Sequence, residues 1–369
     1  MVHLRRVIAI LALSVAGASA QVQAPAPLHT KNIILVVTDG LRWQELFGGA
    51  DSTIVFTDKR RPDWDNRRIL TDYWRAGSQA RREALLPFTW SVIGRQGQIF
   101  GNRNIGSVAT VTNGLKFSYP GYNEMLAGAP DPRIDRNEFG INPNVTVFEW
   151  LNRQPELKGE VAAFATWDVF ADIFARRRSG LPMHVGWETP YARPSNAADS
   201  LLNRLYATSI REWDNNAYDV LMHSVMMRYL EARHPRVVFV GYGETDEWAH
   251  AGRYDRLLAS AHTVDGFLRE LWSFVQSDSV YRDRTTMIVT TDHGRGRTDN
   301  WTDHGRDVRG AEEWWVAVIG PDTPALGERG AGTNVAQSQI AATVAALLGF
   351  DFRRDATQAA APIGDVIRR

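Results

Sequence analysis

Five short apolar runs punctuate the chain, and none of them alternates between apolar and polar residues. They are NIILVV from Asn32, VAAFATW from Val161, RVVFVGYG from Arg236, TTMIVTTD from Thr285 and WWVAVIG from Trp314. Continuous apolar runs of this length are typical of β-strands that are covered on both faces. The pattern therefore predicts five buried strands.

Longer segments with helical spacing separate these runs, most clearly at residues 217–234, 254–276 and 335–350. Strands that alternate with helices predict an α/β fold, with a doubly wound and mostly parallel sheet flanked by helices. Residues 171–213 lack such a pattern, and we expect an irregular insertion or small cap there. We expect residues 31–369 to form a single catalytic domain whose ligands bind beyond the carboxyl ends of the strands.

The first 20 residues predict a secretory signal peptide. Arg5 and Arg6 precede an apolar stretch at residues 7–16, and small residues at 18–20 suit a cleavage site. We expect residues 21–30 to be a disordered leader and the mature protein to be secreted, to a bacterial periplasm. An uncleaved anchor is the alternative, although the apolar stretch is too short for a comfortable membrane span. No other stretch predicts a span.

Composition narrows the chemistry further. The 369 residues carry 42 basic and 42 acidic side chains, so net charge gives no support to a general nucleic-acid-binding role. The chain has no cysteine, which removes thiolate chemistry and zinc–thiolate sites. Any metal ion must therefore be held by His, Asp or Glu. The oligomeric state stays open.

Acidic and imidazole side chains follow three of the predicted strands. Each feature has an ordinary explanation, since Asp before Gly is common in turns and a lone His is usually structural. Asp39 could also cap a helix. Together, however, they would meet at one edge of the sheet and predict a metal site. The candidate ligands are Asp39, Asp246, His250, Asp292, His293 and His304.

This set and its order resemble the alkaline phosphatase superfamily, which includes nucleotide pyrophosphatase/phosphodiesterases, sulfatases, phosphopentomutase and cofactor-independent phosphoglycerate mutase. The family pattern is an Asp after the first strand, a Ser or Thr nucleophile, Asp-x-x-x-His, an Asp-His pair and a final His. The resemblance spans residues 32–305 and implies an alkaline-phosphatase-like fold. The short gap between His293 and His304 is similar to that of the mutases.

The segment KFSYPGYNEMLAGAPDPR, which begins at Lys116, resembles the nucleophile segment of the phosphodiesterases. Aligning the prolines places Ser118 at the nucleophile position, with Thr110 and Thr112 as rivals. Asn123 is the candidate for holding a phosphate oxygen. Sulfatases have an Arg where this chain has Tyr122, which argues against formylglycine formation and a standard sulfatase.

The resemblance implies two divalent metal ions. Asp39, Asp292, His293 and Ser118 would hold the first ion, and Asp246, His250 and His304 the second. Mixed nitrogen and oxygen ligands favour zinc and also allow manganese. Candidates for substrate binding are Lys116, Tyr119 and Tyr122.

The sequence thus predicts an exported two-metal hydrolase of phosphate mono- or diesters, which acts through Ser118 and a phosphoseryl intermediate. Its substrate would be a small anionic phosphoester. The alternatives are a phosphosugar or phosphoglycerate mutase-like metalloenzyme, and a sulfatase-like or phosphonate hydrolase. A non-catalytic binding module on the same fold is the hypothesis from outside the enzymes.

Overall fold

The computed structural model describes residues 27–368, so the predicted signal peptide and most of the leader lie outside the described residues. Its main feature is an eight-stranded sheet in the order β5-β4-β6-β1-β7-β8-β2-β9, accompanied by a two-stranded sheet of β10 and β3. The strands are β1 Asn32–Thr38, β2 Gln98–Phe100, β3 Val108–Thr110, β4 Val161–Ala165, β5 Met183–Val185, β6 Val237–Tyr242, β7 Thr285–Thr290, β8 Val316–Ile319, β9 Gly327–Glu328 and β10 Asn334–Ala336.

The five predicted strands are all present, as β1, β4, β6, β7 and β8. Strand β1 lies between β6 and β7 and is parallel to both. Within the large sheet only β8 runs against its neighbours β7 and β2. The prediction of an α/β fold with a doubly wound, mostly parallel sheet is confirmed.

Helices cover both faces of the sheet. They are α1 Trp43–Gly48, α2 Ser52–Thr57, α3 Asn66–Arg68, α4 Ser78–Leu85, α5 Gly94–Gln96, α6 Ser118–Ala127, α7 Val147–Asn152, α8 Phe170–Ile173, α9 Arg176–Ser179, α10 Ala197–Thr208, α11 Asp219–Arg233, α12 Glu244–His250, α13 Tyr254–Ser277 and α14 Gln339–Leu347. The three helical segments predicted from spacing correspond to α11, α13 and α14.

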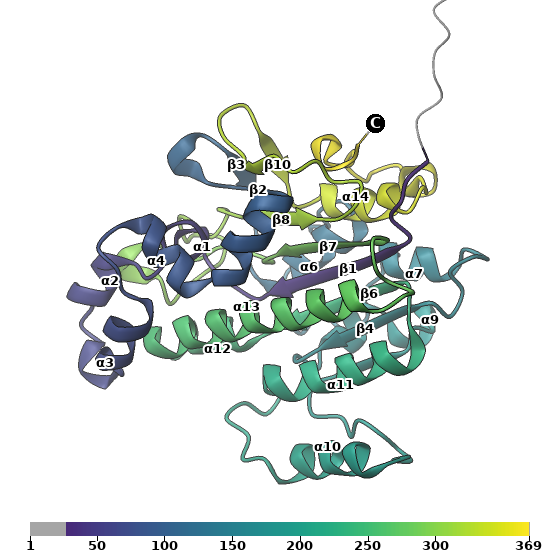
Figure 1. Ribbon diagram of the computed structural model, residues 1–369, viewed down its shortest axis with the longest axis horizontal. Coiled ribbons are helices and arrows are strands. Elements are labelled where there is room, and N and C mark those ends of the chain that lie inside the picture. The colour runs from purple at the N-terminus through teal and green to yellow at the C-terminus, as the bar shows by residue number, and fades with distance from the viewer. Residues whose placement is uncertain (1–26, 369) are drawn as a thin grey trace, which may run out of the picture.

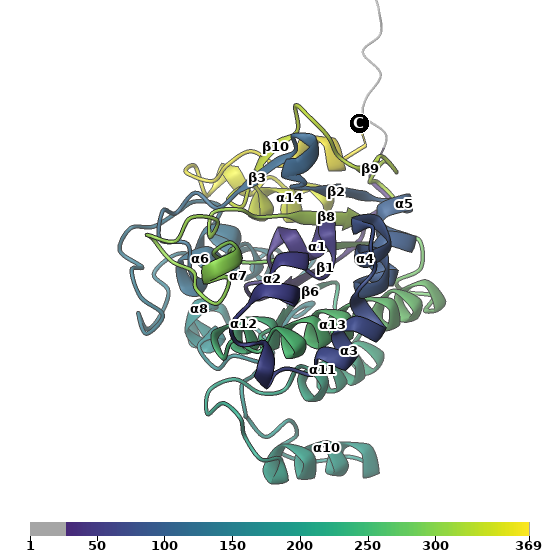
Figure 2. The ribbon, with the colours of Figure 1, turned by 90° about the vertical axis from the view of Figure 1, so that its left-hand side faces the viewer.

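The side chains of β1 show how the two layers form, because successive residues of a strand point to opposite faces. Ile34 and Val36 join a core with α4, α11 and α13. Ile33, Leu35 and Val37 join a second core with α6, α7 and α14. Figures 1 and 2 show these helices on either side of the central strands. A strand buried on both faces needs the continuous apolar run seen in its sequence.

The segment 171–213 is not irregular throughout, which corrects the expectation. Its strand β5 pairs with β4 at the edge of the sheet. Its helix α10 begins at a capping residue, Asn196, whose side chain accepts a hydrogen bond from the backbone of Asp199. In both views α10 stands away from the sheet (Figures 1 and 2). The three-residue strand and the proline-rich approach to α10 hide both elements from a periodicity analysis.

Four further short strands, β2, β3, β9 and β10, also escape sequence analysis because each has three residues or fewer. Across residues 27–368 the helices are too short or too polar to cross a bilayer.

Candidate metal centre

The carboxyl ends of β6, β1 and β7 lie next to one another at one edge of the sheet. Val37 of β1 is aligned with Gly241 of β6 and with Thr290 of β7. The parallel pairing continues one step further, where the backbone N–H of Asp39 donates to the carbonyl of Tyr242 at 2.8 Å. Residues that follow these three strands are therefore brought to the same place.

Gly40 allows the chain to turn sharply at this edge. Its φ of 59° is in the left-handed region, and a Cβ at this position would lie 2.4 Å from the Asp246 carboxylate. Its backbone N–H donates to Oδ1 of Asp292 at 3.0 Å. A glycine is thus required sterically where Asp39, Asp246 and Asp292 come together.

A first group of candidate ligands surrounds Nε2 of His293. This nitrogen lies 3.3 Å from Asp292 Oδ2 and 3.5 Å from Asp39 Oδ1. The hydroxyl of Ser118 lies 3.4 Å from the same nitrogen. His293 holds its other ring nitrogen, Nδ1, 2.9 Å from the carbonyl of Gly294, which fixes the ring and leaves Nε2 facing the carboxylates.

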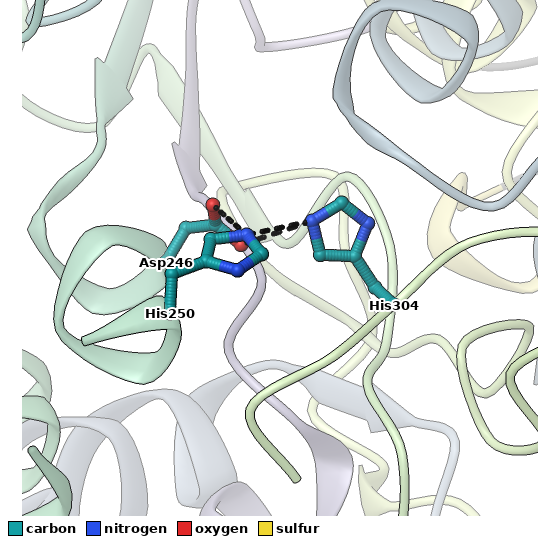
Figure 3. Close-up of side chains that lie close together, drawn as sticks. All are labelled: Asp246, His250 and His304. Carbon is teal, nitrogen blue, oxygen red and sulfur yellow. Dashed lines mark hydrogen bonds and ion pairs between the residues drawn. The ribbon is translucent and has the colours of Figure 1, made fainter. Parts of the chain in front are cut away.

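A second group lies beside the first and is shown in Figure 3. Asp246 and His250 are one turn apart on α12, and Nε2 of His250 lies 3.1 Å from Asp246 Oδ2. His304, in the loop after β7, places its Nε2 at 2.9 Å from Nε2 of His250 and 3.8 Å from Asp246 Oδ1. Asp246 also lies 3.9 Å from His293, so it stands between the two groups.

These side chains fit divalent cations. Ligand atoms bound at about 2.1 Å to a tetrahedral ion stand about 3.4 Å from one another, and the separations within each group are of that size. Two oxygens, Asp39 Oδ1 and Asp292 Oδ2, are buried without a hydrogen-bond partner in the described chain. Because a buried carboxylate oxygen without a partner is costly, a cation is the natural partner for both.

The electrostatics support the same view. Burial raises the pKa of Asp39 well above its usual value, and the nearby carboxylates of Asp292 and Asp246 raise it further. Burial likewise raises the pKa of Asp292 to about 7. Burial also works against ionisation of Asp246, but the guanidinium of Arg295 beside it holds its pKa well below the usual value. Among residues 27–368, no lysine or arginine forms an ion pair with Asp39 or Asp292.

Ser118 is the first residue of α6, and the start of this helix lies against the end of β7. A Cβ at Gly121 would come within 2.6 Å of the carbonyl oxygen of Asp292, so a glycine permits this close approach. The structure therefore places the Ser118 hydroxyl among the candidate ligands. Its rivals have other partners, because Thr112 donates its hydroxyl to Glu124 and the hydroxyl of Thr110 faces the guanidinium of Arg103 at 3.5 Å.

The structure does not bring Asn123 to the site, which corrects the role expected for it. This residue is fully buried within α6, its amide nitrogen faces the carbonyl of Ala129 at 3.4 Å, and its oxygen accepts from Asn144 at 3.0 Å. Asn123 lies in the second turn of α6, where these two contacts hold its amide away from the candidate ligands.

Three side chains expected to bind substrate do not line the pocket at the site. Lys116 points to the carbonyl of Val308 and to the carboxylate of Glu312 at 3.4 Å. Tyr119 is fully buried and donates its hydroxyl to the carbonyl of Gly140. Tyr122 is buried as well, but its hydroxyl donates to Asp39 Oδ2 at 2.9 Å and so orients a candidate ligand.

A pocket of about 190 Å³ opens over the two groups. Its lining includes Asp39, Ser118, Asp246, His250 and His304, and further residues that sequence analysis did not single out, namely Asn137, Glu138, Trp167, Asn215, Asn216, Gly243 and Glu247. Trp167 follows strand β4, so the rule that flagged the other strand ends could have found it. Nothing in the sequence distinguishes the asparagines.

Comparisons with known proteins agree with this geometry. A family model described as Metalloenzyme superfamily matches residues 210–351, which include β6, α12, β7 and the His304 loop. No curated protein matches the chain.

Solved structures of several hydrolases share the fold. Wild-type alkaline phosphatase PafA has 9% identity and a TM-score of 0.58, over 93% of this chain and 100% of that one. The 2-O GAG sulfatase BT1596 has 12% identity and a TM-score of 0.54, over 92% and 74%. The phosphonate monoester hydrolase of Agrobacterium radiobacter has 12% identity and a TM-score of 0.52, over 87% and 74%. The family match and the shared fold confirm the resemblance to the alkaline phosphatase superfamily.

Proposed function

We propose that this chain, an alkaline-phosphatase-like metalloenzyme by family match and fold, is an exported hydrolase of phosphate mono- or diesters that uses Ser118 as its nucleophile. The observation that carries the proposal is the placement of one hydroxyl, 3.4 Å from His293 Nε2, beside two buried carboxylate oxygens that have no hydrogen-bond partner among the described residues. Asp39, Asp292, His293 and Ser118 would hold one ion, and Asp246, His250 and His304 the other. The metals would be zinc, with manganese as the alternative.

Bound divalent cations would lower the pKa of the serine hydroxyl and offset the charge of the phosphoryl oxygens. The chain's own residues hold the nucleophile and the candidate metal ligands in position. The start of α6 fixes Ser118, the Tyr122 hydroxyl orients Asp39, and Gly294 orients His293. Ser118 Oγ forms a bond to phosphorus while the ester oxygen leaves with a proton. Water then hydrolyses the phosphoserine and restores the hydroxyl.

Metal removal and replacement test the proposal. Purified protein is stripped with EDTA, reloaded with zinc or manganese, and assayed with p-nitrophenyl phosphate, its methyl diester, p-nitrophenyl sulfate and a p-nitrophenyl phosphonate. We expect phosphate ester hydrolysis that is lost on stripping and returns on reloading. Hydrolysis that survives both stripping and Ser118→Ala would contradict the proposal, as would a preference for the sulfate ester.

A mutase is the second candidate, because the gap between His293 and His304 is short. A mutase would return the phosphoryl group to another hydroxyl of the same or a similar sugar, and a hydrolase would release it to water. Incubation with ribose 1-phosphate or 3-phosphoglycerate separates the two, since isomerised product indicates a mutase and inorganic phosphate a hydrolase.

A further inference from the structure

One wall of the pocket carries none of the candidate metal ligands, and its chemistry indicates what the substrate looks like. This wall, the polar wall, consists of Asn137, Glu138, Trp167, Asn215, Asn216 and Glu247. Among the described residues that line the pocket there is no lysine or arginine. The part of the substrate that meets this wall is therefore unlike a phosphate, a sulfate or a carboxylate.

The polar wall offers both donors and acceptors of hydrogen bonds in fixed orientations. Asn137 accepts from the backbone N–H of Tyr119 at 3.0 Å, which leaves its Nδ2 group to donate. Asn216 donates to Glu247 Oε1 at 3.1 Å, and its own Oδ1 is buried without a partner in the described chain. Hydroxyl groups both donate and accept, so they match such a surface better than a purely accepting or purely donating ligand does.

Trp167 adds a flat apolar element to the polar wall. Its half-buried ring stands edge-on to Phe170, with centroids 6.1 Å apart, which holds the indole in place. Gly243 lets the Asn216 amide lie close to the backbone of the pocket, because a Cβ there would lie 2.4 Å from that amide. An amphipathic aromatic ring next to amide groups suits the apolar C–H face of a hydroxyl-rich molecule.

Charge distinguishes between phosphate monoesters and diesters. Glu138 and Glu247 face the pocket, and the nearby Arg295 is already paired with Asp246. A monoester dianion would meet two additional carboxylates without a protein cation to balance them, whereas a diester carries a single negative charge. The polar wall therefore disfavours the monoester.

We propose that the substrate is a phosphodiester whose second, non-reacting alcohol is an uncharged, hydroxyl-rich group of the sugar or polyol class. This inference rests on the proposed function of the metal centre and specifies its substrate. The polar wall binds the hydroxyl-rich alcohol while the phosphorus faces Ser118.

A matched pair of synthetic substrates tests the inference. Glycerol p-nitrophenyl phosphate and propyl p-nitrophenyl phosphate share the leaving group, the charge and the three-carbon chain, and differ only in two hydroxyls. With metal-loaded protein we expect kcat/KM at least about tenfold higher for the glycerol diester, because a site built to bind hydroxyls penalises an analogue without them. Equal values for the pair would overturn the inference and leave the proposed function standing. If no phosphate ester is hydrolysed, both fail.

Variants of the polar wall test whether its residues cause the preference for the glycerol diester. We expect Trp167→Ala and Glu247→Gln each to bring the glycerol-to-propyl ratio down by about threefold or more, with Trp167→Phe retaining most of it. The control is Trp272→Ala, a half-buried tryptophan of α13 outside the pocket, which leaves the ratio unchanged. Because both substrates are assayed on the same sample, the ratio does not depend on the folded fraction. A ratio that none of the wall variants changes would overturn the inference.

A charge test completes the experiment. The double variant Glu138→Gln with Glu247→Gln removes both carboxylates of the polar wall. We expect the ratio of kcat/KM for p-nitrophenyl phosphate to that for its methyl diester to rise at least about threefold, because the dianion gains more from the loss of negative charge. An unchanged or lower ratio would contradict the assignment of the diester.

Discussion

Buried carboxylates lie at both ends of the central strands, but they differ in whether the fold provides hydrogen-bond partners for them. At the amino end of β1, Asp322 is 3% exposed and accepts hydrogen bonds from the backbone N–H groups of His29 at 3.0 Å and Thr30 at 2.6 Å. At the carboxyl end, Asp39 is 6% exposed and Asp292 is fully buried, yet each has one oxygen without a partner in the described chain. Residue type and burial are alike, so the difference lies in their partners.

This contrast distinguishes a carboxylate whose partners lie within the fold from the two carboxylates that we propose as metal ligands. Burial works against ionisation of Asp322, but the hydrogen bonds from Thr30 and His29 keep its pKa below the usual value. Burial and mutual repulsion raise the pKa of Asp39 and Asp292. The protein thus supplies hydrogen-bond donors for the carboxylate at the amino end, whereas the lack of partners for Asp39 and Asp292 within the described chain fits their proposed role as metal ligands.

The largest effect we expect concerns the hydroxyl at the carboxyl end. Ser118→Ala removes the proposed nucleophile, and kcat for a p-nitrophenyl phosphodiester should fall by at least about 10³-fold, because a lost nucleophile is not replaced by its neighbours. The measurement is steady-state kinetics on metal-loaded protein. Thr110→Val is the matched control and should stay close to wild type. Substantial activity in Ser118→Ala would assign the chemistry to another group.

The second largest effect we expect is the stabilisation of the folded protein by metal ions bound at the carboxyl end of the strands. At a free zinc concentration about 100 times Kd, the free energy of unfolding should rise by about 2.7 kcal/mol for each ion bound, because the ions bind the folded state. Thermal unfolding with and without zinc measures this change. No zinc-dependent shift would contradict a metal centre.

Asp39→Asn should raise the stability of the metal-free protein and lower the stabilisation that zinc provides. In metal-free protein this substitution removes the buried negative charge of Asp39. One of its carboxylate oxygens lies within 4.8 Å of a carboxylate oxygen of Asp246. We expect stabilisation on the order of 1 kcal/mol, because like charges at that distance repel each other. With zinc present the variant should lose most of the metal-induced stabilisation. If it is less stable without metal, the carboxylate has a structural role like that of Asp322.

The sequence could predict which residues gather at this edge, and the reason is physical. A continuous apolar run identifies a buried strand, and parallel strands have their carboxyl ends on one side, so Asp39, Asp246 and Asp292 could be placed without coordinates. Their roles as ligands stay predictions. The same reasoning does not extend to α6, where tertiary packing buries Tyr122 and Asn123. It does not extend to Asn216 either, which lies just before the predicted helix that begins at residue 217.

Asp322→Asn should affect the amino end with the opposite sign to Asp39→Asn. It weakens two buried hydrogen bonds to a charged acceptor, and we expect a loss of about 1–3 kcal/mol in the free energy of unfolding. The loss should be the same with and without zinc, because the residue lies at the far end of the strands. A loss that depends on zinc would mean that the two ends are coupled.

The smallest effect we expect is the pH dependence of that loss. The folded pKa of Asp322 is below the unfolded value, so its contribution is fully present above about pH 4 and disappears as the pH falls through the folded pKa. The measurement is the difference in unfolding free energy between wild type and Asp322→Asn, both metal-free, by urea titration from pH 6 downward to about pH 3. The raised pKa values of Asp39 and Asp292 change the stability of both proteins equally, so they cancel in this difference. We therefore expect the difference to stay constant down to about pH 4 and to shrink below it. A difference that grows in acid would show that burial and repulsion, rather than its hydrogen bonds, set the pKa of Asp322.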